Sequence, residues 1–393
     1  MAWRTRLVLA IIFSTGQIAV AQQTEDRAPS DDSPPRLTAP AQVPVDLGDG
    51  VPGNGDGPGN VVDGQGGMGG GHPAHRVDMQ GPAFVGGDHV YRAGQWLAAY
   101  RYSAAYLDGN RAGATRLTDQ QALDFLGPVP PGIPGVNAYM MVPTHGTVET
   151  HLLSLMHGIT DDINVYVAPT WMVDSMSMLR RDGATVTSSN DGISDLPFGA
   201  LWRVRKTESD EVILNIGFSA PTGDIDGTYL MPNGMEMRYP YPMRLGHGTW
   251  DACPAITYRY FFDRASIGVQ GRCVLPLGYN HLGYRVGDEY RANVWFDYLL
   301  NEKKTLAATF RVEGLWRSNY AGADSELNPF GMPGNDPNMR GGDYLNFGYG
   351  VSYMIPHKLG RLDFEAVTPI VQNVRGVQLG TDWALAARYL KAF

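Results

Sequence analysis

A two-residue alternation in segment 288–317 constrains the fold of this chain more than any other feature. Before the charged turn at 301–304, apolar side chains occupy every second position: Tyr290, Ala292, Val294, Phe296, Tyr298 and Leu300. After the turn the pattern resumes with Leu306, Ala308, Phe310, Val312 and Trp316. Successive side chains on a β-strand point to opposite faces, so the segment is predicted to be an antiparallel hairpin with one apolar and one polar face. A soluble sandwich would bury the apolar face, whereas a transmembrane barrel would turn it toward lipid.

Other segments repeat this alternation and favour the barrel. They are 96–106, 212–218, 345–353 and 361–366. Their polar faces carry too many charges for one packed core, and their apolar faces are aromatic near the ends, as in the interfacial girdles of membrane barrels. The composition agrees, because 49 Gly, 20 Tyr and only 18% charged residues suit strands and turns.

The lengths of the connections also sort as they do in outer-membrane barrels. Short connections are predicted near 160–162, 207–210, 263–264, 301–304 and 357–360. Between them fall mostly longer ones, near 108–146, 179–192, 222–247, 277–287, 318–342 and 375–380. Short turns at one rim and long loops at the other are typical of outer-membrane barrels. We therefore predict an all-β, transmembrane antiparallel barrel of about twelve strands, with both termini on the periplasmic side.

The N-terminal region divides into two further parts. Residues 1–21 have the basic start, apolar run and Ala-x-Ala end of a cleaved secretory signal. Residues 22–84 are rich in Gly, Pro and Asp and are predicted to be a disordered periplasmic arm, because they cannot bury enough apolar surface to offset chain entropy. The barrel is predicted to span 85–393, and no apolar run after the signal reaches the ~20 residues of a transmembrane helix. These features predict a location in the outer membrane of a diderm bacterium.

The last strand, 381–393, ends in Phe393. A terminal Phe on an amphipathic strand resembles the signal by which bacterial outer-membrane proteins engage the barrel assembly machinery. Lys391 departs from that pattern, which usually has an apolar residue there. An ordinary final strand that happens to end in Phe is the alternative.

Several stretches resemble one family of bacterial outer-membrane proteins. They include "MMVPTHGTVETHLLSLMHGITDDINVYVAPTWMVDSM", "GISDLPFGALWRV", "NIGFSAPTGD" and "ELNPFGMPGNDPNMRGGDYLNFGYG". The family is the one grouped under the meta-pathway of phenol degradation, with transporter-labelled members, and the resemblance covers about 87–393. It implies a β-barrel that passes small molecules, with aromatic compounds among the candidates. It implies no catalytic residues.

The polar faces supply the candidate functional residues. If the barrel prediction is correct, the following side chains line the lumen: Arg101, Arg203, Arg205, Asp251, Arg259, Arg272, Arg291, Asp297, Arg311, Glu313, Arg317, Asp363, Glu365, Asp382 and Arg388. Arginines outnumber carboxylates here, and arginine-lined pores favour anions. The leading hypothesis is passive diffusion of small solutes, aromatic or anionic, through this lumen. The alternative is a sealed structural barrel whose charges pair with one another.

A metal-binding function is a further alternative. Met68, His72, His75 and Met79 lie close together in the arm, with His89 nearby, and a second group of Met and His surrounds 140–157. Thioether and imidazole ligands suit copper in an oxidising compartment, which would make the chain a copper-binding or metal-resistance protein. The spacing matches no known ligand motif, and methionine also fills gaps in apolar surfaces. No cofactor is predicted.

Cys253 and Cys273 lie equally far from the turn at 263–264. An oxidising compartment permits a disulfide between them. A two-residue turn, however, pairs Cys273 with Pro254, so the sulfurs meet only if a bulge shifts the register. Both outcomes stay open.

Catalysis and nucleic-acid binding fit poorly. Ser154 lies between His151 and His157 in sequence but alternates to the opposite face, and "GGMGGG" lacks the Lys of a phosphate loop. The net charge is −9, with no basic stripe. The chain is predicted not to be an enzyme.

Overall fold

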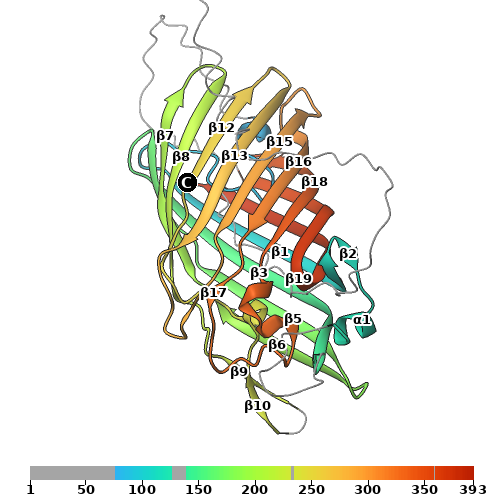
Figure 1. Ribbon diagram of the computed structural model, residues 1–393. Coiled ribbons are helices and arrows are strands. Elements are labelled where there is room, and N and C mark those ends of the chain that lie inside the picture. The colour runs from blue at the N-terminus through green and yellow to red at the C-terminus, as the bar shows by residue number, and fades with distance from the viewer. Residues whose placement is uncertain (1–75, 126–138, 232–233, 358) are drawn as a thin grey trace, which may run out of the picture. The chain divides into compact units, whose positions relative to one another are not determined.

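The computed structural model describes residues 76–125, 139–231, 234–357 and 359–393, which all belong to one compact unit, 35–393. They form a closed antiparallel β-barrel (Figure 1). Around the barrel, each strand pairs with the next and the last pairs with the first: β1 (Trp96–Gly113), β19 (Gly360–Ala392), β18 (Gly342–Ile355), β16 (Leu306–Arg317), β15 (Glu289–Leu299), β13 (Ala265–Pro276), β12 (Ala255–Phe261), β8 (Asp210–Ala220), β7 (Leu196–Lys206), β4 (Ile163–Val167) and β3 (Met141–Gly158).

The long strand β19 contributes two strands to the barrel wall. Its first half, 360–374, pairs with β18, and its second half, 374–392, pairs with β1. The chain reverses around Gly376, whose φ of 81° favours glycine, and the side chain of Gln372 bonds the backbone of Thr381 across the reversal. The eleven labelled strands, with β19 counted twice, give a barrel of twelve strands. The predicted all-β barrel of about twelve strands is confirmed.

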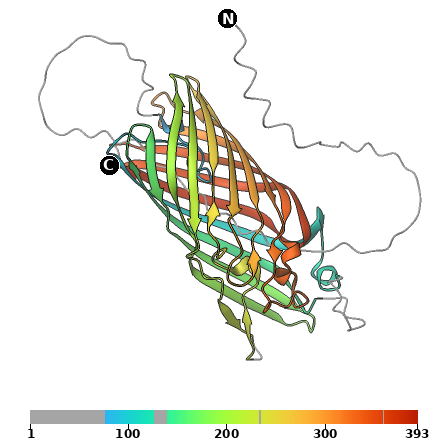
Figure 2. The same cartoon turned by 60° about the vertical axis from the view of Figure 1, so that its left-hand side comes forward.

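One rim of the barrel carries the tight turns and the C-terminus. The turns near 159–162, 207–209, 262–264 and 300–305 are short, as predicted. The N–H of Phe393 donates to the carbonyl of Trp96 at 2.8 Å, which fixes the end of the last strand to the start of the first. Figure 2 shows the C-terminus at the rim opposite the β9–β10 hairpin.

The opposite rim carries the long connections and most of the small elements. The predicted long loop at 179–192 is wrong, because β6 forms a hairpin with β5 that leaves only a four-residue turn. The loop predicted at 108–146 is shorter than expected, since β1 continues to Gly113 and β3 begins at Met141; its Pro-rich part lies outside the described residues. The remaining elements are β5 (Thr170–Arg180), β6 (Thr185–Ile193), β2 (Thr115–Arg116), β9 (Thr228–Leu230), β10 (Glu236–Arg238), β11 (Asp251–Ala252), β14 (Tyr284–Arg285), β17 (Ala321–Gly322), α1 (Asp119–Leu123), η2 (Tyr241–Met243), η3 (Pro333–Asn335) and η4 (Pro337–Met339).

The apolar faces of the strands point outward. Tyr290, Phe296 and Phe310 are 44%, 40% and 47% exposed, while Asn293 and Arg311 on the alternate positions are 1% and 2% exposed. This arrangement is unfavourable in water and favourable in a bilayer, where the outer band contacts hydrocarbon. Among the described residues, no helix is long and apolar enough to cross a membrane.

Trp295 is one of the aromatic exceptions, because it alternates with the polar set and lies inside the barrel, 1% exposed. Space for its indole ring comes from two glycines. A Cβ on Gly268 of the neighbouring strand would overlap the ring, and a Cβ on Gly81 would approach it to 3.2 Å. The lumen at this level is therefore packed to contact.

Candidate functional site: the barrel lumen

A segment that precedes the first strand lies inside the barrel. We call residues 76–91 the strap; it contains the short helix η1 (Val77–Met79) and most of its residues are buried. Nearly all of the arm predicted over 22–84 falls outside the described residues, but its last nine residues, 76–84, belong to the strap. The structure therefore includes these residues in the folded unit, inside the lumen.

Five lumen arginines hold the strap by its backbone carbonyls, two of them, Arg101 and Arg203, through longer bonds of 3.5 and 3.4 Å to Ala83 and Val90. Arg259 donates to the carbonyl oxygens of Asp78, at 2.6 Å, and of Met79. Arg388 donates to Val85 and Gly81 at 2.9 and 2.8 Å, and Arg361 donates to Gly81 at 3.1 Å. Hydrogen bonds from a charged donor are stronger than neutral ones, so the strap is bound by the strongest donors in the wall.

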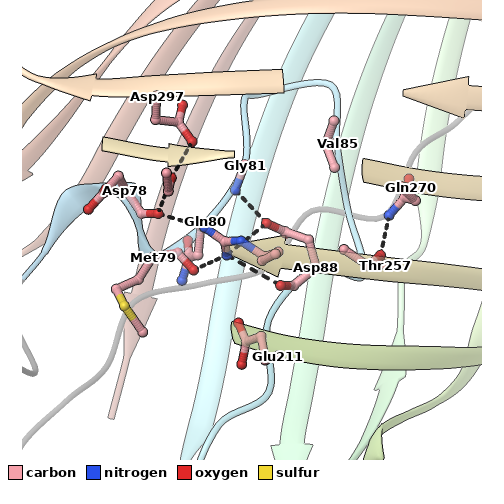
Figure 3. Close-up of polar contacts among 12 residues, drawn as sticks. Asp78, Met79, Gln80, Gly81, Val85, Asp88, Glu211, Thr257, Gln270 and Asp297 are labelled. Atoms are coloured by element: carbon pink, nitrogen blue, oxygen red, sulfur yellow. Dashed lines mark hydrogen bonds and ion pairs between the residues drawn. The ribbon is translucent and has the colours of Figure 1, made fainter. Parts of the chain in front are cut away.

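The strap also makes polar contacts through its side chains and N–H groups (Figure 3). Asp88 forms an ion pair with Arg259 at 3.3 Å and accepts from the N–H of Gly81. The wall residue Gln270 donates to the carbonyl of Gly86 at 2.7 Å, and the N–H of Phe84 donates to Glu365 at 2.8 Å. Contacts thus come from strands on several sides of the barrel.

The wall charges themselves form a continuous ladder of ion pairs on β15, β16 and β19. From the long-loop end inward, the ladder runs Arg317–Glu289 (2.6 Å), Glu289–Arg291 (3.0 Å), Arg291–Glu313 (2.9 Å), Glu313–Arg311 (2.8 Å) and Arg311–Glu365 (2.7 Å). A separate group joins Asp363 to both Arg361 and Arg388, at 2.6 and 3.0 Å. Each guanidinium in these groups faces a carboxylate, which offsets its desolvation.

The structure places most of the predicted lumen residues inside the barrel. Those that are buried are Arg101, Asp251, Arg259, Asp297, Arg311, Glu313, Asp363, Glu365 and Arg388. The side chains of Arg203, Arg291 and Arg317 are 8–12% exposed, and Arg272 is half-buried. Arg203 pairs with Asp162 of a short turn at 3.0 Å, so it lies at the rim rather than at mid-height.

Arg205 and Asp382 are the two predicted lumen residues that are exposed. The register between β7 and β8 shifts between Arg203 and Arg205, and the register between β1 and β19 shifts beside Asp382. The side chain of Arg205 is 60% exposed as a result. A β-bulge moves every later side chain to the other face, which simple alternation does not anticipate.

A cavity of about 110 Å³ lies at the long-loop end of the lumen. Its charged lining residues are Asp195, His247, Asp251, Arg272, Glu289, Arg317 and Arg340, and its apolar ones include Met172, Pro197, Leu245, Val274 and Val286. The cavity is separated from the strap along β15 and β16. Glu289 and Arg317 lie at the long-loop ends of these strands, whereas the strap lies near residues 297 and 309, toward their opposite ends.

A histidine and two carboxylates meet on one side of this cavity. His247 contacts Asp251 through Nδ1 at 2.5 Å, and its backbone N–H donates to Asp195 at 2.7 Å. Burial lowers the pKa of His247, but the neighbouring carboxylates of Asp251 and Asp195 outweigh it and raise that pKa to about 9. His247 is therefore a cation at neutral pH.

Arg340 differs from the arginines of the ladder, each of which forms an ion pair. It lies in the loop before β18 and is 4% exposed. Its Nε and Nη1 donate to the carbonyls of Met339 and Gly334, at 2.9 and 3.1 Å, whereas its Nη2 is buried with no hydrogen-bond partner among the described residues. Burial lowers the pKa of this guanidinium to about 10. Such a desolvated charge calls for a counter-ion.

The metal and disulfide hypotheses have separate outcomes. Met68, His72 and His75 lie outside the described residues, and Met79 is half-buried with its carbonyl bonded to Arg259. Both cysteines are free; the N–H of Cys273 donates to the carbonyl of Pro254 at 3.0 Å, as the unbulged register requires. The disulfide alternative is therefore not realised.

Sequence reasoning missed three parts of this site: the strap, Arg361 and the group around His247 and Arg340. The stretch "GPAFVGGDHV" offered a signal for the strap, because its apolar residues are unusual in a Gly- and Asp-rich arm. Arg361 belongs to the same alternating polar face as Asp363 and Glu365 and could have been included. His247 and Arg340 are in irregular loops, where no periodicity identifies them.

Comparison with known proteins bears on the fold. No protein-family model matches the chain, and no curated protein matches its sequence. Among solved structures, a COG4313 outer membrane channel from Pseudomonas putida F1 matches with a TM-score of 0.50 and 13% identity, over 77% of this chain and 96% of that one. A FadL homologue of Pseudomonas aeruginosa matches with a TM-score of 0.40 and 13% identity, over 80% and 93%. The Pseudomonas putida toluene transporter TodX matches with 0.37 and 8%, over 79% and 92%.

The first of these structures shows the fold, which is that of an outer-membrane β-barrel. The other two, with TM-scores below 0.5, add no argument. This fold supports the predicted location in the outer membrane of a diderm bacterium. The phenol meta-pathway grouping stays a prediction.

Proposed function

We propose that this protein is an outer-membrane channel for small solutes whose lumen is closed at rest by the strap. The observation that carries the proposal is the burial of residues 76–91 inside a barrel whose arginines donate to strap carbonyls. A barrel that only anchors a protein needs no polar segment at its centre. Water can replace the strap carbonyls when the strap leaves the lumen, because both states satisfy the same donors. The apolar strap residues, such as Phe84 and Val85, pack inside the barrel and oppose this departure.

The arginine ladder suits a selective path rather than a wide pore. Its charges alternate along the wall from Arg317 to Glu365, so a solute passing them meets fixed dipoles of both signs. Removing one carboxylate or one arginine would leave an uncompensated charge that selects for the opposite sign. The lumen is thus more balanced than an arginine-biased pore, and its selectivity depends on which pairs open with the strap.

Planar-bilayer recordings on the full chain test this proposal. The wild-type barrel is expected to show low or rare conductance, and a variant carrying both Arg259→Gln and Arg388→Gln is expected to conduct more, because the strap loses most of its strong donors. Arg375→Gln, an exposed arginine outside the lumen, is the matched control and should behave as wild type. If the double variant folds and still does not conduct, the sealed structural barrel replaces the channel.

A further inference from the structure

We propose that the cavity at the long-loop end binds a small organic monoanion, a carboxylate with an apolar body, through Arg340. This inference deepens the proposed function and rests on it, since it assigns the cavity as a binding site on the solute path. Arg340 lines the cavity, is nearly fully buried, and has one terminal nitrogen without a partner among the described residues. Buried polar groups are bonded in the great majority of native sites, so this nitrogen marks a place for a ligand or water.

The charges around the cavity favour an anion. Its lining has three carboxylates, Asp195, Asp251 and Glu289, and three arginines, Arg272, Arg317 and Arg340. His247 adds a fourth positive charge at neutral pH, and burial raises the pKa of the Asp195 carboxyl, so the lining is net positive. A bound monoanion reduces this excess of positive charge, whereas a cation would increase it.

The carboxylates are already engaged, which argues against a cation. Asp195 accepts from the N–H groups of Gly223, at 3.0 Å, and His247. Asp251 accepts from Thr249 at 2.7 Å and contacts His247. Although Asp195, His247 and Asp251 lie close enough to resemble a metal-binding group, their oxygens and Nδ1 are occupied by one another and by the backbone. The unsatisfied group is Arg340, which is a donor.

The cavity's size and walls set the ligand class. About 110 Å³ is smaller than the engineered ~150 Å³ cavity that admits benzene, so the occupant is smaller than a substituted ring. Met172, Leu245, Val274 and Val286 provide apolar surface for a short aliphatic body, while Tyr320 and Arg317 lie beside it. A guanidinium recognises a carboxylate with charge-assisted bonds, which supplies orientation as well as affinity.

Isothermal titration calorimetry tests the site on the full chain in detergent at low chloride. The probes are butyrate, butan-1-ol and butylammonium, which share one short aliphatic chain and differ in charge. Butyrate is expected to bind saturably, butan-1-ol at least about tenfold more weakly, and butylammonium least, since hydrogen bonds to a charged group contribute ~1.5–3 kcal/mol. Equal affinity for butyrate and butan-1-ol, or no butyrate binding, overturns the proposal.

Variants localise the binding. Arg340→Gln is expected to weaken butyrate binding by about tenfold or more, and the exposed Arg375→Gln by less than about twofold. An unchanged affinity in a folded Arg340→Gln chain overturns the assignment to this cavity; if that variant does not fold, the three-probe series on the wild type still decides. Butyrate binding without conductance refutes the channel and keeps the site, whereas conductance without butyrate binding refutes the site alone.

Discussion

The strap level and the cavity level of the same lumen treat buried arginine in opposite ways. At the strap level, Arg388 has a carboxylate at 3.0 Å and two strap carbonyls within 2.9 Å. At the cavity level, Arg340 has two carbonyls, no ion pair among the described residues, and a buried nitrogen without a partner. At the strap level Arg388 and Arg259 are paired with carboxylates, although the Nε of Arg259 has no hydrogen-bond partner among the described residues. At the cavity level the charge of Arg340 has no such pair, and this is where we propose that a ligand binds.

This difference teaches that charge inside a barrel has two uses. A fully paired guanidinium specifies the position of a segment, here the strap, because breaking the pair leaves a charge without compensation. A buried guanidinium without an ion pair can bind an anionic ligand. The two levels lie apart along β15 and β16, and the ladder of ion pairs connects them, from Glu289 and Arg317 at the cavity to Glu365, which accepts from Phe84 of the strap.

The largest effect is expected from Arg311→Ala at the strap level. It removes the partner of Glu313 and Glu365 from the ladder, at 2.8 and 2.7 Å, and leaves both carboxylates buried. Breaking a buried pair by truncating one partner costs ~3–5 kcal/mol. Denaturant unfolding from detergent micelles should show that loss, and bilayer recordings should show a shift toward cation selectivity. A loss below ~1 kcal/mol would mean that water already screens the ladder.

The next effect is expected from Gly268→Ala, which tests whether the strap level is tightly packed. The added methyl would overlap the ring of Trp295, which is 1% exposed and also lies against Gly81 of the strap. Overpacking of this kind costs ~1–3 kcal/mol in unfolding free energy. Gly271→Ala on the same strand is the matched control, because its Cβ would find its nearest neighbour at 3.9 Å. Equal stability of the two variants would contradict close packing around Trp295.

A smaller, pH-dependent effect is expected at the cavity level from His247→Gln. The folded-state pKa of His247, about 9, is above its ordinary value of 6.5, so the stabilisation is complete below pH 6.5 and is lost as pH rises through 9. Because the side chain is 29% exposed, we expect the wild type to exceed the variant by ~1–2 kcal/mol at pH 6. Unfolding titrations at pH 6 and pH 10 should show the gap closing. A gap that widens with pH would reverse the proposed charge of His247.

The smallest effect on stability is expected from Phe393→Ala, which touches neither level. Phe393 is 66% exposed on the lipid-facing side, and its main role in the fold is the backbone pairing with Trp96 that alanine keeps. Unfolding free energy should change by less than ~0.5 kcal/mol. If the terminal Phe engages the barrel assembly machinery, as we propose, pulse-chase assembly in cells should slow clearly. Unchanged assembly would refute that role while leaving the strap and cavity comparison intact.

The wall of the barrel could be predicted well because it depends on local rules. Alternation placed Asn293 and Arg311 inside and Phe296 and Phe310 outside, and it failed only where bulges shift the register, at Arg205 and Asp382. The contents of the lumen were harder to predict from the sequence. Whether an arginine faces water, a carboxylate or a strap carbonyl depends on residues far away in the chain, such as Gly81 for Arg388.

The sequence by itself determined the barrel of about twelve strands, its outward apolar face and the inventory of charges. These follow from the two-residue period of apolar side chains and from the lengths of the turns. Only the tertiary structure decided that residues 76–91 enter the lumen, that the ladder is paired from Arg317 to Glu365, and that Arg340 is not. The physical reason is distance along the chain. Periodicity reports on which face a side chain lies, but pairing energies depend on which remote groups closure of the barrel brings within reach.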